Sequence, residues 1–274
     1  MEQAILLDAI KAAICAGEEI LAIYNDPRQD FQIEQKADNS PLTIADRKAH
    51  EVISSYLQKT PYPILSEEGK KKPYEERSSW NVLWIVDPLD GTKEFIKRNG
   101  EFTVNIALVK EGVPTLGVIY VPVNRTLYFG ESQLGAYKVE MTQSINELTW
   151  DVLLSRAYKL PMNCEHENFV IVASRSHLSP ETEIYVDDMK QKYGAVKLIS
   201  SGSSIKICLV AEGFGDVYPR FAPTMEWETA AGHAIARAAG MEIYRVEDGK
   251  EQNEPLSYNK KDLLNPWFIV KPVK

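Results

Sequence analysis

The chain has 274 residues, of which 44% are hydrophobic and 26% are charged, and this ordinary composition predicts a globular protein with a large buried core. Its formal net charge of −8 argues against nonspecific binding to polymeric nucleic acid. Cys15, Cys164 and Cys208 are widely spaced, odd in number and form no Cys-x-x-Cys pair, which argues against a disulfide framework and a zinc site and fits a reducing cytoplasm.

The first part of the chain predicts two helices. Apolar residues repeat at helical spacing from Ile5 to Tyr24, and a second helix is expected from Asp46 to Gln58. The N-terminus lacks the residue order of a signal peptide, and no stretch is apolar enough to span a membrane. We expect a cytoplasmic protein with no integral membrane segment, and peripheral association with the inner face of the membrane stays open.

Two expected strands are each followed by carboxylates. Tyr62–Ser66 precedes Glu67, and the buried run Val82–Val86 precedes Asp87 and Asp90. Ligands gather at the carboxyl ends of strands in open α/β sheets, so these acids could share one divalent cation. Hard oxygen ligands suit Mg²⁺, Mn²⁺ or Ca²⁺. The alternative is ordinary turn chemistry, for which Asp-Pro-x-Asp-Gly is also typical.

The residues after Asp90 are typical of a phosphate-binding turn. Gly91 permits close approach of a ligand to the backbone, and Thr92 is expected to be the N-cap of a helix that begins at Lys93. The free amides of that first turn could hold a phosphate beside the carboxylates. Taken alone, Thr92 is equally explained as a plain helix cap.

The next segments predict an antiparallel meander, so that residues 1–149 form a mostly antiparallel α+β lobe, with a charged loop from Lys70 to Glu76. From about Trp150, strands and helices alternate, and residues 150–274 predict a second, α/β lobe. The expected elements are 102–109, 114–121, 126–130, 169–173, 180–193, 196–199, 203–212, 215–218, 224–239, 241–245 and 267–270.

A second anion-binding segment is expected in the C-terminal half. Gly202, Ser203 and Ser204 form a hydroxyl-rich helix start close to Lys206, and Arg220 follows in a short strand. Arginine suits bidentate recognition of phosphate. The pattern alone is weak, because serine-rich helix starts are common and a lone lysine is usually solvated.

The helix expected at 224–239 has a face of small residues, which indicates close packing against a neighbour, and Gly240 should end it. Glu228 lies in its first turns at the edge of the buried face, where the helix dipole favours an anion. His233 lies on the opposite side and is expected to be solvated or to cap locally.

Four segments resemble, in order, the four motifs of the inositol monophosphatase superfamily: Pro41–Asp46, Leu65–Gly69, Asp87–Thr92 and Trp227–Gly232. Asp87–Ala107, together with Lys36–Pro41 and Gly202–Lys206, most resembles the CysQ-type 3'(2'),5'-bisphosphate nucleotidases. The resemblance covers nearly the whole chain and is weakest from Thr126 to Asn168. It implies the two-lobed, five-layered αβαβα sandwich of the sugar phosphatases, with the metal site between the lobes.

The resemblance also implies a metal site. Two or three Mg²⁺ ions would be held by Glu67, Asp87, Asp90, the backbone carbonyl of Leu89, and Glu228. The family usually has Asp at the position of Glu228, and the extra methylene either re-aims the carboxylate or requires a small backbone shift. Glu226 is the competing ligand, although Glu226 and Glu228 cannot face the same way on a helix.

By the same resemblance, Thr92, supported by Asp46, orients and deprotonates a metal-activated water that attacks the phosphorus in line, and Glu67 completes the catalytic residues. No phospho-enzyme is expected. The implied substrate contacts are Glu67, Leu89, Asp90, Gly91, Thr92, Ser174, Arg175, Gly202, Ser203, Ser204, Lys206, Arg220 and Glu228. His177, in the loop that lies near adenine in related enzymes, is left without an assigned role.

The resemblance finally implies a lithium-sensitive phosphoric monoester hydrolase. Its expected reaction converts 3'-phosphoadenosine 5'-phosphate (PAP) to AMP and phosphate, and its sulfonated precursor PAPS to APS, in sulfur assimilation and PAP recycling. An inositol or sugar monophosphatase is the alternative, because it shares every metal motif. A regulator that binds a metal or nucleotide without turnover is a third. The expected partner is a small molecule, and the sequence leaves monomer and homodimer open.

Overall fold

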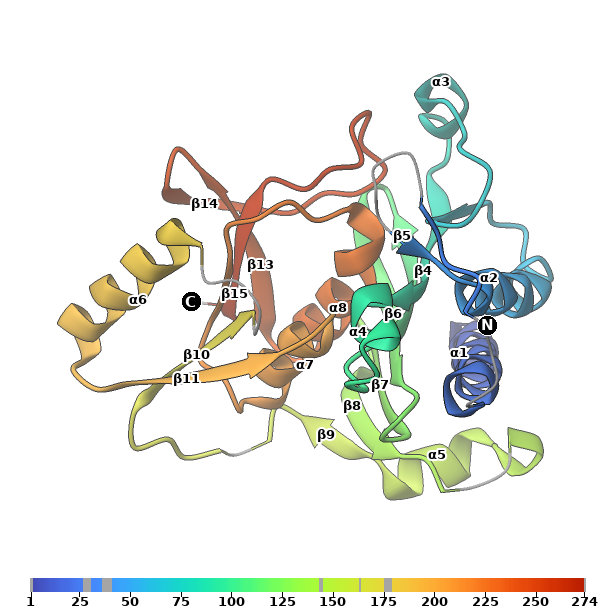
Figure 1. Cartoon of the computed structure of the whole chain (residues 1–274), viewed down its shortest axis with the longest axis horizontal. Coiled ribbons are helices and arrows are strands. Elements are labelled where there is room, and N and C mark those ends of the chain that lie inside the picture. The colour runs from blue at the N-terminus through green and yellow to red at the C-terminus, as the bar shows by residue number, and fades with distance from the viewer. Residues whose placement is uncertain are drawn as a thin grey trace.

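The structure, a computed structural model, describes residues 2–26, 31–35, 41–142, 145–162, 164–174 and 179–273 (Figure 1). The helices are α1 (Glu2–Asn25), α2 (Ile44–Leu57), α3 (Tyr74–Arg77), α4 (Thr92–Ile96), α5 (Trp150–Arg156), α6 (Pro180–Tyr193), α7 (Ile205–Glu212) and α8 (Glu226–Ala238), with a 3₁₀ turn η1 (Ile145–Glu147). The strands are β1 (Glu34–Gln35), β2 (Pro41–Leu42), β3 (Ile64–Ser66), β4 (Val82–Asp90), β5 (Thr103–Lys110), β6 (Val113–Val121), β7 (Thr126–Glu131), β8 (Gly135–Glu140), β9 (Tyr158–Leu160), β10 (Phe169–Ser174), β11 (Val196–Ser201), β12 (Tyr218–Arg220), β13 (Met241–Glu247), β14 (Lys250–Pro255) and β15 (Trp267–Pro272).

A seven-stranded sheet in the order β3-β4-β5-β6-β7-β8-β9 is the largest unit. β3 and β4 are parallel, and every other neighbouring pair is antiparallel. The β-branched and aromatic residues of these strands are buried on both faces, as expected for a sheet covered by helices on each side. The predicted meander is therefore confirmed, whereas β8 and β9 were not anticipated.

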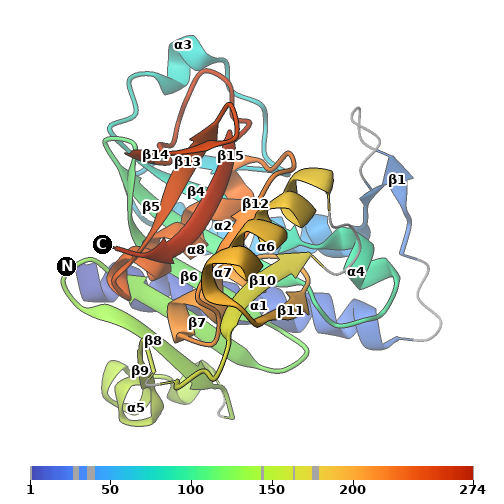
Figure 2. The same ribbon diagram turned by 90° about the vertical axis from the view of Figure 1, so that its left-hand side faces the viewer.

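The elements stack in five layers, which can be followed across Figure 1 from α1 and α2 to α6. α1 and α2 cover one face of the seven-stranded sheet, and α8 covers the other face together with α7. A four-stranded sheet in the order β12-β15-β13-β14 lies beyond α8, and the view in Figure 2 shows it beside α6. This arrangement confirms the predicted αβαβα sandwich.

In the C-terminal half, β10 and β11 form a separate parallel pair. The four-stranded sheet is antiparallel throughout. The predicted helix at 180–193 coincides with α6. β14 was missed because its sequence, Lys-Glu-Gln-Asn-Glu-Pro, is polar and mostly exposed. β9 extends the sheet formed by the N-terminal half, and the division into lobes at residues 149 and 150 stays a prediction.

Helix α8 is fixed against the seven-stranded sheet by glycines. A Cβ atom at Gly117 on β6 would lie 2.2 Å from the carbonyl oxygen of Ala231 and 2.9 Å from the Cβ of Ala234. At Gly130 on β7, a Cβ would lie 3.1 Å from that of Ala238. The small-residue face predicted for this helix is thus confirmed as a close packing surface, and it determines where the first turn of α8 lies.

No helix in the described ranges is long and apolar enough to cross a lipid bilayer.

Candidate active site

Asp46 is buried in the first turn of α2, where it completes the capping box with the N-cap residue Thr43 and contacts Thr92. Its Oδ2 accepts hydrogen bonds from the backbone nitrogen of Thr43 at 2.7 Å and from the Thr43 hydroxyl at 2.5 Å. Its Oδ1 accepts one from the Thr92 hydroxyl at 3.1 Å. The capping box therefore fixes a carboxylate whose other oxygen is left for Thr92.

The turn after β4 differs from the prediction at its cap. Gly91, with φ of 96°, is the N-cap of α4, and Thr92 is the first helical residue. A positive φ favours glycine, so the expectation that Thr92 caps this helix was wrong. Its hydroxyl instead lies 3.1 Å from Asp46 Oδ1 and 3.3 Å from the carbonyl oxygen of Leu89.

Four carboxylates from three separate segments influence one another. Asp87 is 1% exposed, and its pKa is raised well above the usual value by burial and then by the charges of Glu67, Asp90 and Glu228. Burial, followed by the charge of Asp90, raises the pKa of Glu228 to about 8. The acids at the ends of β3 and β4 and at the start of α8 thus lie close enough for their charges to act on Asp87 and Glu228, and their assignment as ligands of one cation stays a prediction.

Within the described residues, no group of three or more His, Cys, Asp and Glu side chains has the close arrangement of a formed metal centre. The donor set nevertheless fits a hard divalent cation. Neighbouring acids raise the pKa of Asp87 and of Glu228, so a nearby positive charge would stabilise their ionised forms, and carboxylate oxygens suit Mg²⁺. Glu67, Asp87, Asp90 and Glu228 are the residues that would hold it.

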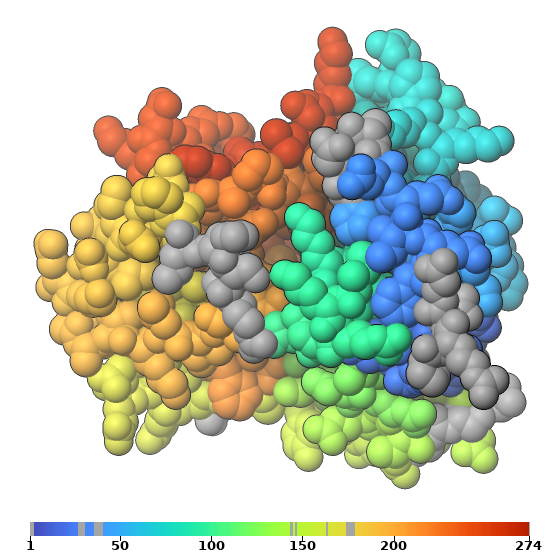
Figure 3. Space-filling model, viewed as in Figure 1, coloured from blue at the N-terminus to red at the C-terminus, as the bar shows by residue number. Residues whose placement is uncertain are grey.

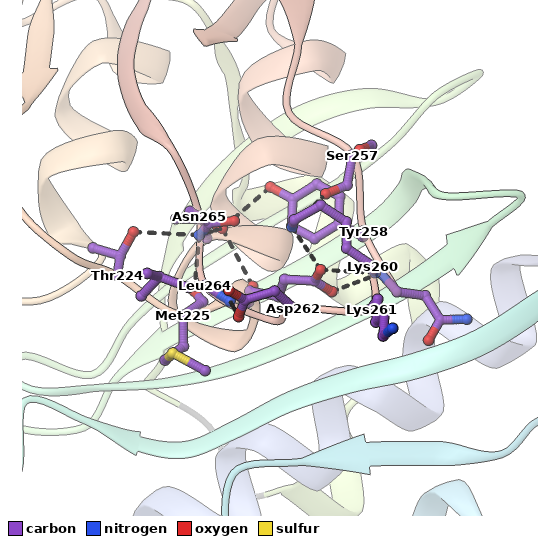
Figure 4. Close-up of polar contacts among 12 residues, drawn as sticks. Thr224, Met225, Ser257, Tyr258, Lys260, Lys261, Asp262, Leu264 and Asn265 are labelled. Carbon is purple, nitrogen blue, oxygen red and sulfur yellow. Dashed lines mark hydrogen bonds and ion pairs between the residues drawn. The ribbon is translucent and has the colours of Figure 1, made fainter. Parts of the chain in front are cut away.

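Glu226 is already engaged by the loop that carries Lys260 and Asn265, two residues labelled in Figure 4. Its carboxylate accepts hydrogen bonds from the backbone nitrogens of Asn259 (2.6 Å) and Lys260 (3.0 Å) and from Lys260 Nζ (2.6 Å). Asn265 in the same loop donates to the carbonyl oxygen of Met225 at 3.0 Å. These contacts anchor the start of α8 and favour Glu228 over Glu226 as a ligand.

The second predicted anion-binding segment meets the first at Asp90. The hydroxyls of Ser203 and Ser204 both donate to Asp90 Oδ2 at 2.6 Å. Gly202 packs so closely that a Cβ there would lie 2.8 Å from the carbonyl oxygen of Glu101. The hydroxyls expected to contact a nucleotide therefore contact a carboxylate in this structure.

Lys206 is 6% exposed, and its ammonium donates to the carbonyl oxygens of Ser203 at 2.6 Å and Ser201 at 3.3 Å. Burial lowers its pKa to about 8, although Asp90 opposes this. Arg220 donates to the carbonyl oxygen of Pro223 at 3.3 Å, and its charge lies close enough to affect Lys206 and Glu228. The second predicted anion-binding segment is therefore polar and positively charged.

A cavity of about 440 Å³ opens over this region. Figure 3 shows the surface hollowed between the green α4 segment and the orange C-terminal half. Of the predicted site residues, those that line it are Asp90, Gly91, Gly202, Ser203, Ser204, Lys206, Arg220 and Glu228. Lys93 and Lys97 on α4 line it too and were not anticipated. Ser174 ends β10, while Arg175 and His177 lie outside the described residues.

Two further residues were missed by sequence analysis. Thr103 and Asn105 on β5 are buried and lie in the hydrogen-bond network around Asp90. The signal was present, because two polar residues at alternate positions of an apolar strand point to the same face.

His233 contradicts the expectation of a solvated side chain. It is fully buried, with Nδ1 3.0 Å from the Tyr258 hydroxyl and Nε2 in contact with a carboxylate oxygen of Glu242. The four-stranded sheet covers the face of α8 that a single amphipathic pattern would leave to solvent, which is why the sequence reading was wrong.

Comparison with known proteins agrees with the five-layered fold described above. The profile of the Inositol monophosphatase family matches residues 2–270. The Escherichia coli K12 protein named 3'(2'),5'-bisphosphate nucleotidase CysQ is 44% identical over 258 residues, covering 93% of this chain and 94% of that protein. The crystal structure of CysQ from Bacteroides thetaiotaomicron, described as a bacterial member of the inositol monophosphatase family, has a TM-score of 0.90 and 61% identity over 98% of this chain and 97% of its own.

An inositol monophosphatase from Anabaena has a TM-score of 0.67 at 21% identity, covering 98% of this chain and 90% of its own, and so supports the fold alone. The chain therefore belongs to the inositol monophosphatase family, and it is a phosphatase of that superfamily.

Proposed function

We propose that this protein removes the 3'-phosphate of PAP, with AMP and inorganic phosphate as products, and that it acts likewise on PAPS to form APS. The observation that carries the proposal is a single cavity in which Asp90 and Glu228 lie with the basic residues Lys93, Lys97, Lys206 and Arg220. The acids suit a metal-dependent phosphatase site, and the basic groups suit a substrate with a second phosphate. The names of the CysQ relatives support this substrate.

The cofactor in this proposal is Mg²⁺, two or three ions per site, held by Glu67, Asp87, Asp90, Glu228 and the carbonyl oxygen of Leu89. When bound, Mg²⁺ would neutralise phosphate charge and lower the pKa of water. The proposed setting is PAP recycling during sulfur assimilation in the cytoplasm.

Thr92 and Asp46 would accept the proton released by the attacking water molecule. The Thr92 hydroxyl donates to Asp46 Oδ1 at 3.1 Å, so its lone pairs can accept a proton from a water molecule while its own proton passes to Asp46. The contacts of Thr43 with Asp46 Oδ2 keep the receiving carboxylate in place. The oxygen of water would form the new P–O bond while the bond between phosphorus and the 3'-ester oxygen breaks. The leaving oxygen would take up a proton from solvent to become the 3'-hydroxyl, and the backbone amides of Gly91 and Thr92 would hold phosphate oxygens.

The test compares phosphate release from PAP and from inositol 1-phosphate at matched concentrations, with Mg²⁺ present and the nucleoside product identified by chromatography. We expect a strong preference for PAP with AMP as the product. Preference for inositol phosphate would instead support the monophosphatase alternative, and no turnover of either would support a binding protein. In ¹⁸O-labelled water, a single turnover should place one label in phosphate, whereas a phosphorylated side chain would contradict direct attack.

A further inference from the structure

One carboxylate oxygen of Asp90 receives four hydrogen bonds. Oδ2 accepts from the Ser203 hydroxyl at 2.6 Å, from the Ser204 hydroxyl at 2.6 Å and backbone nitrogen at 2.8 Å, and from Asn105 Nδ2 at 3.3 Å. A carboxylate oxygen has two lone pairs, so these donors saturate Oδ2 and favour Oδ1 as the oxygen that binds a cation. We call Thr103, Asn105, Ser203 and Ser204 the Asp90 cage.

Asn105 can serve the cage in only one orientation of its amide. Nδ2 also donates to the Ser204 hydroxyl at 2.8 Å, while Oδ1 accepts from the Thr103 hydroxyl at 2.9 Å. The reversed amide would place its oxygen against the carboxylate of Asp90, which is repulsive. Thr103 and Asn105 are 0% and 1% exposed, so solvent does not replace these contacts. Thr103 thus fixes the group that fixes Asp90.

The cage also connects β5 with the starts of α7 and α8. The hydroxyls of Thr103 and Ser203 are 2.7 Å apart, and the Ser204 hydroxyl lies 2.8 Å from the carbonyl oxygen of Glu228. Lys206 donates to the carbonyl oxygen of Ser203 at 2.6 Å, and Ser203 has the uncommon φ of 49° for a residue with a side chain. These contacts tie the carboxylate of Asp90 to the backbone of the first turn of α8, which carries Glu228.

We infer that Thr103 and Asn105 are positioning residues that orient Asp90 for metal binding, and that Ser203 and Ser204 serve the same purpose. The inference rests on the metal-dependent function proposed above. A purely structural network would stabilise the fold without altering metal affinity. Because groups that hold a metal ligand typically change metal affinity about 10- to 100-fold when removed, the two roles can be told apart.

The experiment measures Mn²⁺ binding to the full chain by the loss of the free-ion electron paramagnetic resonance signal, without substrate. Asn105→Leu keeps the size of the side chain and removes both donors, and should raise the Mn²⁺ Kd about tenfold or more. Thr103→Val should raise it in the same direction by less, since it acts through Asn105. Thr103→Ser retains the hydroxyl and should stay within about twofold of the wild-type protein.

Thr115→Val on β6 is the control, because it removes a partly buried threonine hydroxyl of the same sheet that contacts only the carbonyl oxygen of Leu108 among the described side-chain hydrogen bonds. Asp90→Asn is the reference for loss of the ligand. The inference is overturned if Asn105→Leu and Thr103→Val bind Mn²⁺ like the wild-type protein, or if Asp90→Asn does. If Asn105→Leu does not fold, the comparison of Thr103→Val with Thr103→Ser tests the inference by itself. A wild-type protein that binds Mn²⁺ but does not cleave PAP would contradict the proposed function and leave the positioning role intact.

Discussion

Glu228 shows how one residue can combine a helix cap with a proposed ligand. Its carboxylate accepts the backbone nitrogen of Met225 at 2.7 Å, and Asp46 makes the equivalent contact with Thr43 through a shorter side chain. Glu228→Asp should therefore keep the cap and the stability but withdraw the carboxylate from Asp90 by one methylene. We expect the half-saturating Mg²⁺ concentration to rise about threefold or more, measured by titrating phosphate release, with substrate preference unchanged.

Glu131→Asp is the control for this change. Glu131 also accepts backbone nitrogens, those of Gln133 at 3.1 Å and Leu134 at 3.0 Å, but it does not line the cavity. Its Mg²⁺ dependence should match that of the wild-type protein. An unchanged Mg²⁺ dependence in Glu228→Asp would contradict the assignment of Glu228 as a ligand. Another acid would then have to fill its place, although Glu226 is held by Lys260 and Asn259.

At the scale of elements, the position of α8 on β6 determines where Glu228 lies. The carbonyl oxygen of Ala231 would be 2.2 Å from a Cβ at Gly117, so Gly117→Ala must push the helix away from the sheet. Such overpacking costs about 1–3 kcal/mol. We expect a lower free energy of unfolding in urea together with a higher half-saturating Mg²⁺ concentration, because the displaced helix carries a proposed ligand.

Gly249→Asn provides the comparison for Gly117→Ala. Gly249 has φ of 70°, which Asn tolerates, and nothing lies within 4 Å of the added Cβ. The free energy of unfolding and the half-saturating Mg²⁺ concentration should both stay close to those of the wild-type protein. If Gly117→Ala lost stability but kept its Mg²⁺ dependence, the position of α8 would not control the site.

For the whole molecule, His233 makes the free energy of unfolding depend on pH. It joins α8 to β13 through Glu242 and to the β14–β15 loop through Tyr258. Burial lowers its pKa below the usual 6.5, so the unfolded chain binds a proton there more readily than the folded one. Glu242, in contact with Nε2, opposes this effect without cancelling it, so the contribution is present above pH 6.5 and is lost as the pH falls through the folded pKa.

The measurement compares the free energy of unfolding of the wild-type protein and His233→Gln from pH 7.5 down to about pH 5. The advantage of the wild-type protein should shrink on acidification, because glutamine does not titrate. A constant difference for His233→Gln would show that this residue does not contribute to acid sensitivity.

Much of the fold and of the acidic site follows from local patterns. Helical periodicity predicts α1, α2, α6 and α8, and alternating apolar runs predict the meander, because both depend on neighbours within a few residues. The acids Glu67, Asp87 and Asp90 were predicted to converge because they end adjacent strands, and their mutual effect on the pKa of Asp87 agrees. β8 and β9 are short and contain few buried residues, and β14 is polar and mostly exposed, so their patterns are too weak to be found in this way.

Local patterns in the sequence thus predicted most helices and the meander, and the resemblance of its motifs to a known family implied the layered fold and the proposed acidic ligands. Only the tertiary structure decided what surrounds them: Gly91 rather than Thr92 at the cap, His233 in the interior, and Ser203 on Asp90, 113 residues away in the chain. Periodicity and capping are short-range properties of neighbouring residues. The partners of a buried polar group are chosen by how distant elements pack, and the sequence of one segment carries no record of that choice.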